Sequence, residues 1–315
     1  MLERKSFIQI TRDGDGVAVI DYLCRRFTYH ARQKWLDELV AERLFLNGLP
    51  IGDDEVLHEG DCLEYRPEPR PEPQVDTAVS VVEQSDKWAV LSKSGNLPCH
   101  PAGCFFNNTL WALIKTGRIP GVAPHDEIHF VTRLDRETSG IVLVAWDAQT
   151  ARMATKALAS SDAVKEYRVL VEGNFPDSLE ADGWLWTAQD ATVSKKRRFS
   201  SELPPPTALN VVSAATSFSC ISRFDGMSEL SAVLHTGRTH QIRATLCGLG
   251  YPVVGDKLYG VDETCFLRFI KGEMTHDDMI HLRMPRQALH AYRLSFKLDG
   301  REISVTAPVA WNVNR

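Results

Sequence analysis

Apolar residues near the start of the chain recur with helical spacing. Val19, Ile20, Leu23 and Phe27 fall on one face of a helix. A second helix is predicted over residues 32–42, where four apolar residues again share a face. Two short helices in succession predict a small helical hairpin at this end of the chain.

Short strands follow these helices. A strand over residues 44–46 runs into an Asn-Gly pair at 47–48, the strongest short-range signal for a hairpin turn. Strands at 56–57 and 62–65 flank a further turn at 59–61. The first part of the chain therefore reads as a small α+β unit.

A proline-rich segment separates this unit from the rest. Residues 66–74 carry proline at every second position, which removes backbone donors and favours an extended polyproline conformation. Such a segment is a semi-rigid spacer. We therefore predict a first domain over residues 1–66, a linker over 67–76 and a second domain over 77–315.

Strand patterns outnumber helical ones in the second domain. The predicted strands are 79–82, 88–92, 141–145, 167–171, 230–234 and 292–296. The predicted helices are 109–115, 150–160 and 239–246. Because strands and helices do not alternate regularly, the pattern predicts an α+β fold with a largely antiparallel sheet. Residues 260–286 show no clear period and suggest no function.

Composition agrees with two folded domains. The chain has 315 residues, of which 43% are hydrophobic and 24% charged, which excludes disorder, collagen and coiled coil as its main architecture. Its net charge of -5 gives no argument for nucleic acid, so such contacts would need local basic patches. Two patches qualify, although either could be a solvated surface: Arg25, Arg26, Arg32, Lys34 and Arg43, and the run 195–198.

The cysteines and the apolar runs indicate a cellular location. Seven scattered cysteines, an odd number without a Cys-x-x-Cys pair, suggest reduced thiols. No apolar run approaches the roughly 18 residues of a membrane span, and no signal peptide is apparent. We therefore expect a cytoplasmic protein with no membrane segment.

Residues 129–140 form the first segment that suggests chemistry. Asp135 is flanked by Arg133 and Arg136 and followed by a Thr-Ser-Gly turn at 138–140. An arginine within about 4–6 Å lowers an aspartate pKa by roughly 1–3 units. Asp135 is therefore predicted to stay ionised and to act as nucleophile or base. The alternative is a structural ion pair.

Residues 236–246 form the second such segment. A strand ends at Leu234, Gly237 permits a tight turn, and Thr239 is a suitable N-cap for the following helix. His240 and Arg243, three residues apart, project from one helical face. By itself this cluster could bind phosphate or carboxylate.

Taken together, these motifs resemble the RluA family of pseudouridine synthases. The matching segments, in the family's order, are Trp88–Lys93 with Leu97–Pro101, Arg133–Asp135 with Thr138–Gly140, Lys165–Tyr167 with Gly173, Gly237–Arg243, Gly255-Asp256 and Arg286–Ala291. The first domain resembles the alpha-L RNA-binding motif, which many members carry, at Tyr29–Arg32, Leu46–Gly48 and Gly60-Asp61. The chain departs from the family pattern at Thr132, usually His, and at Ser94, usually Pro.

The resemblance implies an isomerase that converts uridines of structured ribosomal or transfer RNA to pseudouridine after flipping the base out. It makes Asp135 the catalytic carboxylate, Arg243 its ion-pair partner, and Tyr167 the residue against the flipped base that takes the proton from C5. Arg133 would fill the vacated position. The expected RNA-binding residues are Arg133, Arg238, His240, Lys93 and Arg32.

No cofactor or metal is expected, because the reaction is an internal rearrangement and the sequence has no dinucleotide-binding, Walker or zinc-site motif. Structured RNA is the expected partner, and the chain is expected to be a monomer. Two alternatives stay open. One is a non-catalytic RNA-binding or ribosome-assembly protein. The other is a hydrolase that uses Asp135 with His240 or His290 and needs a second carboxylate or a metal.

Overall fold

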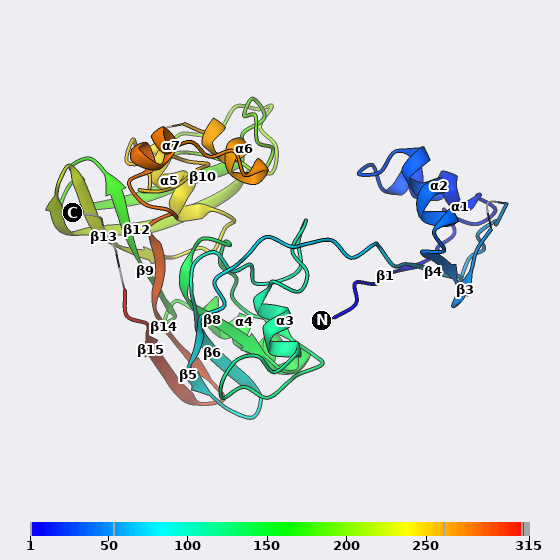
Figure 1. The fold of residues 1–315 in the computed structure, drawn as a ribbon. Helices are drawn as coiled ribbons and strands as arrows, with labels where there is room; N and C mark the ends of the chain where they lie inside the picture. The colour runs from blue at the N-terminus through cyan, green and yellow to red at the C-terminus, as the bar shows by residue number, and fades with distance from the viewer. Residues whose placement is uncertain (1, 53, 261, 310, 312–315) are drawn as a thin grey trace. The chain divides into compact units, whose positions relative to one another are not determined.

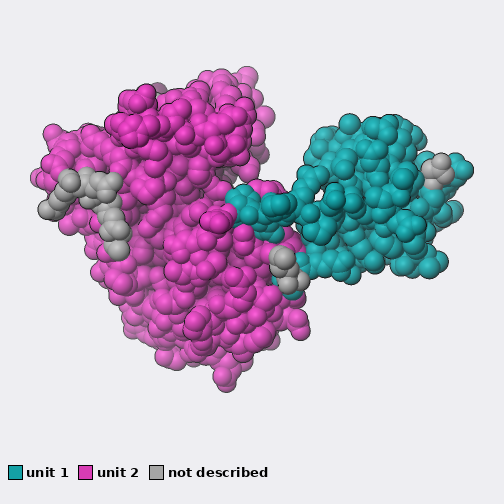
Figure 2. Space-filling model, in the orientation of Figure 1, with its two compact units in different colours: residues 1–73 teal, residues 74–315 magenta. Residues whose placement is uncertain are grey.

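The computed structural model describes residues 2–52, 54–260, 262–309 and 311 (Figure 1). The chain divides into two compact units, residues 1–73 and 74–315 (Figure 2). The predicted linker, residues 67–76, spans this boundary. No helix among the described residues is long and apolar enough to cross a membrane.

The first unit packs two helices against a four-stranded antiparallel sheet. Its elements are β1 Ser6–Gln9, α1 Val19–Arg26, α2 Arg32–Val40, β2 Leu44–Leu46, β3 Leu49–Pro50 and β4 Cys62–Tyr65, with strand order β1-β4-β2-β3. Trp35 of α2 is fully buried in the core beside Leu23 and Leu63. The predicted strand at 56–57 is wrong, since Val56 makes only an isolated bridge to Ala18.

The second unit is built on one large sheet. Its strands are β5 Val79–Gln84, β6 Trp88–Lys93, β7 His129–Phe130, β8 Ser139–Ala145, β9 Val164–Glu172, β10 Ser178–Thr187, β11 Arg197–Ser200, β12 Val212–Phe224, β13 Met227–Leu234, β14 Leu289–Leu298 and β15 Arg301–Thr306. The order is β11-β10-β12-β13-β9-β14-β8-β6-β5, with β15 paired to β14 and β7 to β8. Within the described residues, only the short pairing of β14 with β8 is parallel. The prediction of a largely antiparallel α+β fold is confirmed.

Five helices cover this sheet: α3 Leu110–Lys115, α4 Ala148–Leu158, α5 Gln241–Gly248, α6 Thr264–Lys271 and α7 His276–Leu282. α4 packs on β8 and β14, and α5 packs on β10 and β11. α4 begins two residues before its prediction because the side chain of Asp147 accepts a hydrogen bond from the Thr150 N–H and caps it there. The 260–286 stretch, for which the sequence showed no period, forms α6 and α7, near α5 in Figure 1.

Two hydrophobic cores meet at β9. One lies under β9–β13 and α5, and the other lies under β6, β8, β14, β15 and α4. Tyr167 of β9 packs against both. Tyr167 therefore lies where the two halves of the sheet join.

The parallel contact of β8 with β14 fixes the end of the loop that precedes β8. Gly140 adopts φ 105°, and a Cβ there would lie 2.3 Å from the carbonyl oxygen of Ala291. Only glycine permits this approach. The loop from Val131 to Thr138 is therefore anchored directly at its C-terminal end.

Candidate active site

Asp135 lies in the loop between β7 and β8, where backbone contacts hold it. Its carbonyl oxygen accepts a hydrogen bond from the Thr138 N–H at 3.1 Å, which closes a turn. Thr132, at the position where the family usually has histidine, accepts from the Leu143 N–H at 2.8 Å. The substitution thus gives the loop another attachment to β8.

An arginine shared between two aspartates orients the Asp135 carboxylate. Arg243 Nη1 donates to Asp135 Oδ2 at 2.6 Å, while its Nε and Nη2 donate to both oxygens of Asp256 at 2.6 and 2.9 Å. The exposed fractions of the side chains are 30% for Asp135, 7% for Arg243 and 0% for Asp256. The predicted ion pair between Asp135 and Arg243 is therefore present. Of the two carboxylates on Arg243, only that of Asp135 is partly open to solvent.

This network keeps Asp135 ionised. Burial alone would raise the pKa of Asp135, but the charge and the hydrogen bond of Arg243 outweigh it and hold the pKa below its usual value. Asp256 is anchored by the backbone N–H groups of Leu258 and Tyr259, each at 2.9 Å. The bidentate contact fixes the guanidinium plane, so the remaining Nη1 points at Asp135.

The two arginines adjacent in sequence do not perform this task. Arg133 is exposed, and the guanidinium of Arg136 lies over the rings of Phe105 and Phe269. The prediction that they hold Asp135 ionised is wrong. The required charge comes from α5.

His240 approaches Asp135 from the start of α5. Its Nε2 lies 3.7 Å from Asp135 Oδ1, and its Nδ1 lies 2.9 Å from the hydroxyl of Tyr259. That hydroxyl accepts from the Arg197 N–H at 2.9 Å and can also donate its own proton to Nδ1. In a neutral ring with that arrangement, the ring proton is on Nε2 and faces Asp135. Burial lowers the pKa of His240, which favours this neutral form.

The local backbone at His240 differs from the prediction. α5 begins at Gln241, and His240 occupies the N-cap position in the left-handed conformation at φ 58°. Thr239 is therefore not the cap. The side-chain oxygen of Gln241 accepts from the Arg238 N–H and the Thr236 hydroxyl, which ties down the turn before the helix.

Tyr167 supplies an aromatic surface with a free hydroxyl. Burial, and then the charge of Asp135, raises the pKa of Tyr167 to about 12, so the phenol is protonated at neutral pH. Among the residues that the structure describes, its hydroxyl has no hydrogen-bond partner. In this form the hydroxyl can donate a hydrogen bond to a bound molecule. It can take the proton from C5, as the family resemblance implies, only if its own proton leaves.

Lys93 holds the Asp135 loop from inside. Its side chain is 2% exposed, and its ammonium group donates to the carbonyl oxygens of Ser94 at 3.1 Å, Asp135 at 3.4 Å, Arg136 at 3.3 Å and Thr138. Burial lowers its pKa to about 8. We expected Lys93 to contact RNA. Its buried ammonium instead supports the backbone of the loop.

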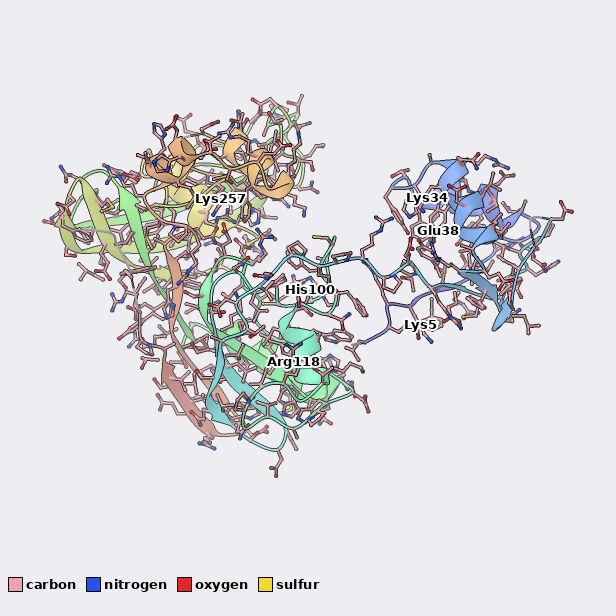
Figure 3. All side chains as sticks on the ribbon, viewed as in Figure 1. Lys5, Lys34, Glu38, His100, Arg118 and Lys257 are labelled. Carbon is pink, nitrogen blue, oxygen red and sulfur yellow. The ribbon has the colours of Figure 1, made fainter. Side chains whose placement is uncertain are left out.

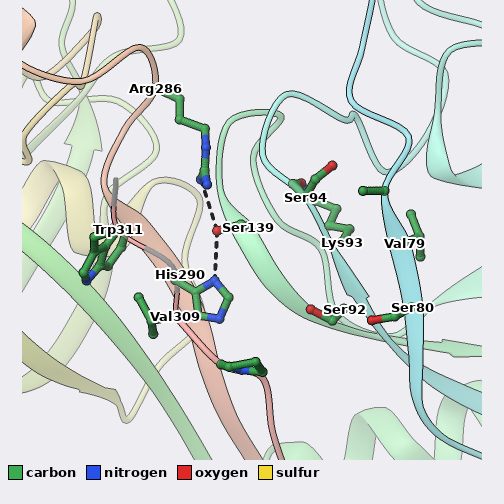
Figure 4. Close-up of a pocket in the computed structure, with 12 residues that line it drawn as sticks. Val79, Ser80, Ser92, Lys93, Ser94, Ser139, Arg286, His290, Val309 and Trp311 are labelled. Carbon is green, nitrogen blue, oxygen red and sulfur yellow. Dashed lines mark hydrogen bonds between the residues drawn. The ribbon is translucent and has the colours of Figure 1, made fainter. Parts of the chain in front are cut away.

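A cavity of about 370 Å³ lies on the side of the loop near Lys93 (Figure 4). His290 Nε2 lies 3.1 Å from the Ala307 carbonyl oxygen and therefore donates to it, so Nδ1 accepts from the Ser139 hydroxyl at 2.9 Å. Arg286 Nη1 donates to the same hydroxyl at 3.2 Å. Both ring nitrogens of His290 are thus used away from Asp135, which removes the geometric basis of the hydrolase alternative for this histidine.

Side chains from the later part of the chain hold the loop residue by residue. Besides Arg243 on Asp135, the contacts are Lys257 Nζ to Glu137 at 2.7 Å, Gln287 Nε2 to Thr138 at 2.5 Å, and Arg286 to Ser139. Lys257 is labelled in Figure 3. The sequence analysis missed Lys257 and Gln287 as site residues, although each lies within or beside a quoted motif. Phe269, whose ring lies against Arg136, could not have been predicted as a site residue, because the segment 260–286 shows no periodic pattern or motif.

The remaining predicted residues make contacts outside this network. Arg238 is exposed before α5, and its Nε donates to the Ser213 carbonyl oxygen at 3.1 Å. Arg32 belongs to the first unit and pairs with Asp21. The structure therefore joins Asp135, Arg243, His240 and Lys93 through contacts within the second unit.

One cluster outside the site has side chains suited to metal binding. Asp262, Cys265 and Asp278 converge on α6 and α7. Arg268 donates to Asp262 at 3.0 Å and to Asp278 at 2.8 Å, and thereby occupies both carboxylates. The cluster is an ion-pair network that joins the two helices.

Comparisons with known proteins agree with this arrangement. Residues 87–247 match the model of the RNA pseudouridylate synthase family. The chain is 28% identical over 279 residues to the tRNA pseudouridine(31) synthase of Saccharomyces cerevisiae, covering 78% of this chain and 67% of that protein. It is 31% identical over 243 residues to the ribosomal large subunit pseudouridine synthase D of Xanthomonas campestris, covering 76% and 69%.

Solved structures show the same fold. Human RNA pseudouridylate synthase domain containing 1 superposes with a TM-score of 0.58 at 23% identity, covering 76% of this chain and 86% of that one. The family match, the relatives and the fold lead to one conclusion. The chain belongs to the RNA pseudouridylate synthase family and is an RluA-type pseudouridine synthase.

Proposed function

We propose that this enzyme isomerises specific uridines in structured RNA, ribosomal or transfer, with Asp135 as its single catalytic carboxylate. The observation that carries the proposal is the Asp135–Arg243–Asp256 network, which keeps one partly exposed carboxylate ionised and aimed. The substrate class is supported by relatives named for large-subunit ribosomal RNA and for tRNA.

The reaction breaks the bond between ribose and uracil N1, turns the base, and joins ribose to C5. Nothing is oxidised or reduced, so a positioned charge and a held base are sufficient. Asp135 accepts a hydrogen bond from Arg243 through Oδ2, while Oδ1 faces His240. The partly exposed carboxylate can then meet the target nucleotide without losing its charge.

A uridine within a stem reaches this carboxylate only after leaving the stack, at a cost of a few kcal/mol. Tyr167 offers a flat surface for the flipped base beside Asp135. Arg133, exposed two residues before Asp135, is placed to enter the vacated position and bond the unpaired base. Loops and bulges, whose bases are already splayed, lower this cost and are the expected targets.

We expect Tyr167→Phe to lower kcat by about 100-fold or more, because the change keeps the ring and removes the free hydroxyl, and general acid–base groups contribute about 10²–10⁴-fold. RNA affinity should stay nearly unchanged. Single-turnover rates and equilibrium binding on the same RNA separate the two effects. An equal loss of affinity and turnover would mean that the tyrosine is structural.

We further propose that residues 1–66 are an alpha-L-type RNA-binding module, joined by the 67–76 linker to a catalytic domain over 77–315. Several cations of its helix pair are already neutralised. Glu38, which is buried, pairs with Lys34 at 2.6 Å and with Arg43 at 3.1 Å. Lys34 and Glu38 lie on α2 (Figure 3), and Arg43 directly precedes β2. Arg32 pairs with Asp21. The module is thus expected to bind only a few phosphates.

Removal of residues 1–70 should weaken RNA binding and reduce its salt dependence, because fewer counterions are released. Turnover of a short stem-loop at saturating RNA should survive, since Arg243 and His240, which contact Asp135, belong to the second unit. Titrations at several salt concentrations and a saturating kinetic assay measure both. A truncated chain that is folded but inert at saturation would show that the module helps to form the active site.

The target is found by mapping pseudouridines in total RNA from cells with and without this gene. Purified full-length chain is then incubated with unmodified transcripts that contain the lost sites. We expect the wild-type chain to restore them. If no site is lost in the cells and no transcript is modified, the proposed function is wrong.

A further inference from the structure

The guanidinium of Arg136 has an unusual environment for a half-buried cation. Its central carbon lies 5.2 Å from the ring centre of Phe105 and 4.5 Å from that of Phe269, over both rings. No hydrogen bond or ion pair reaches it from any residue that the structure describes. Phe105 lies before α3, and Phe269 lies on α6.

The adjacent acidic side chain, that of Glu137, is shared with a lysine. Glu137 is bound by Lys257 at 2.7 Å, and Lys257 also lies 4.5 Å from the ring of Phe269. The Glu137–Lys257 pair is neutral, so the charge of Arg136 remains. A partly buried charge without an anionic partner is costly, and cation–π contacts offset only part of that cost.

The rings of Phe105 and Phe269 limit the contacts that this guanidinium can make with RNA. With aromatic rings on its faces, it has little room to stack on a nucleobase. The N–H groups at its edge are unused, and they match a pair of oxygens from one planar or tetrahedral anion. The site therefore suits the non-bridging oxygens of a phosphate better than it suits a base.

We propose that Arg136 binds a backbone phosphate of the RNA next to the target uridine, and that α6 serves to hold this arginine through Phe269. The inference rests on the proposed function for the identity of the RNA. Consecutive Cα atoms are only about 3.8 Å apart. A phosphate on Arg136 therefore fixes the RNA backbone directly relative to Asp135.

The test uses the full chain carrying Asp135→Asn, to prevent turnover, and a short RNA stem-loop with a uridine-rich loop. We expect Arg136→Gln to weaken binding about tenfold at low salt, the usual range for a charge-assisted contact. The slope of log affinity against log salt should become less steep by about 0.7–0.9, the value for one phosphate. Arg301→Gln is the matched control, because Glu83 already neutralises Arg301 at 2.6 Å, and it should change neither quantity.

Single methylphosphonate linkages, which remove one phosphate charge at a time, locate the contact. Affinity for the Arg136-containing protein should fall most at one linkage, and the Arg136→Gln protein should be insensitive there. Arg136→Lys keeps the charge but not the paired donors, so it should retain the salt slope with reduced affinity. Phe269→Leu should weaken binding through the same linkage.

Each contrary outcome is distinct. An unchanged salt slope in a folded Arg136→Gln protein would make the arginine structural. If the loss of RNA affinity depended on the identity of one base and not on one linkage, the N–H groups of Arg136 would bind a guanine and not a phosphate. These experiments measure RNA binding and not pseudouridine formation. If the chain bound the phosphate but formed no pseudouridine, this inference would stand and the proposed function would fail.

Discussion

Replacement of Asp135 by asparagine is expected to abolish pseudouridine formation while fold and RNA binding stay nearly intact. Asparagine has almost the same shape, and its carbonyl oxygen can still accept the Arg243 hydrogen bond, but it carries no charge. The rate should fall by about 10⁴-fold or more, as for other essential catalytic groups. The measurement is pseudouridine formed with time in an RNA that the wild-type chain modifies.

Asp256→Asn is the matched control, because it removes the other carboxylate on the same arginine. Asp256 is fully buried and cannot touch RNA. It should lower stability more than Asp135→Asn does and reduce activity less. A substantially wild-type rate in Asp135→Asn would overturn the catalytic assignment.

Replacement of Arg243 by leucine should cut activity severely and also destabilise the fold. Asp256 would keep only its backbone donors, and removal of one partner from a buried pair costs about 3–5 kcal/mol. Asp135 would keep only His240 nearby, and its pKa would rise. Activity requires the ionised carboxylate, so the residual rate of the variant should be lost at a higher pH than that of the wild type as the pH falls.

Two measurements separate the effects on stability and on catalysis. Melting curves record the first, and pH–rate profiles record the second. In the double variant Arg243→Leu with Asp256→Asn, the buried negative charge is gone, so stability should partly return while activity stays low. If activity returned with stability, Arg243 would serve only to fold the site.

The lowered pKa values of Asp135 and Asp256 also define how stability depends on pH. A carboxylate with a folded pKa below its unfolded value stabilises the native state above the unfolded pKa. This contribution is lost as the pH falls through the folded pKa. The network therefore contributes fully at neutral pH and fails only in acid.

Helices with strong local signals were predictable from the sequence. α2, α3, α4 and α5 begin within two residues of their predicted starts. β10, β11 and β12 were missed because their buried and exposed faces differ little in polarity. In β12, for example, the buried positions are Ala214, Thr216 and Phe218, and the alternate ones include serine and alanine.

The Asp135–Arg243 ion pair was predicted from family resemblance and not from spacing. Asp135 and Arg243 are 108 residues apart, and local charge suggested Arg133 and Arg136 instead. Lys93 shows the opposite limit. Its polarity alone predicts an exposed side chain. In the structure the side chain is buried, and its ammonium group donates hydrogen bonds to backbone carbonyl oxygens of the loop.

The side chains that hold the Asp135 loop have a consequence for the timing of activity. Arg243, Lys257, Phe269, Arg286 and Gln287 all follow the loop in the chain, the last by 152 residues (287 minus 135). At about 5–20 residues per second, a ribosome needs roughly 8–30 s to add them. A nascent chain that ends after β9 has Asp135 and Tyr167 but no Arg243. Activity therefore begins only after the chain has been made as far as Gln287.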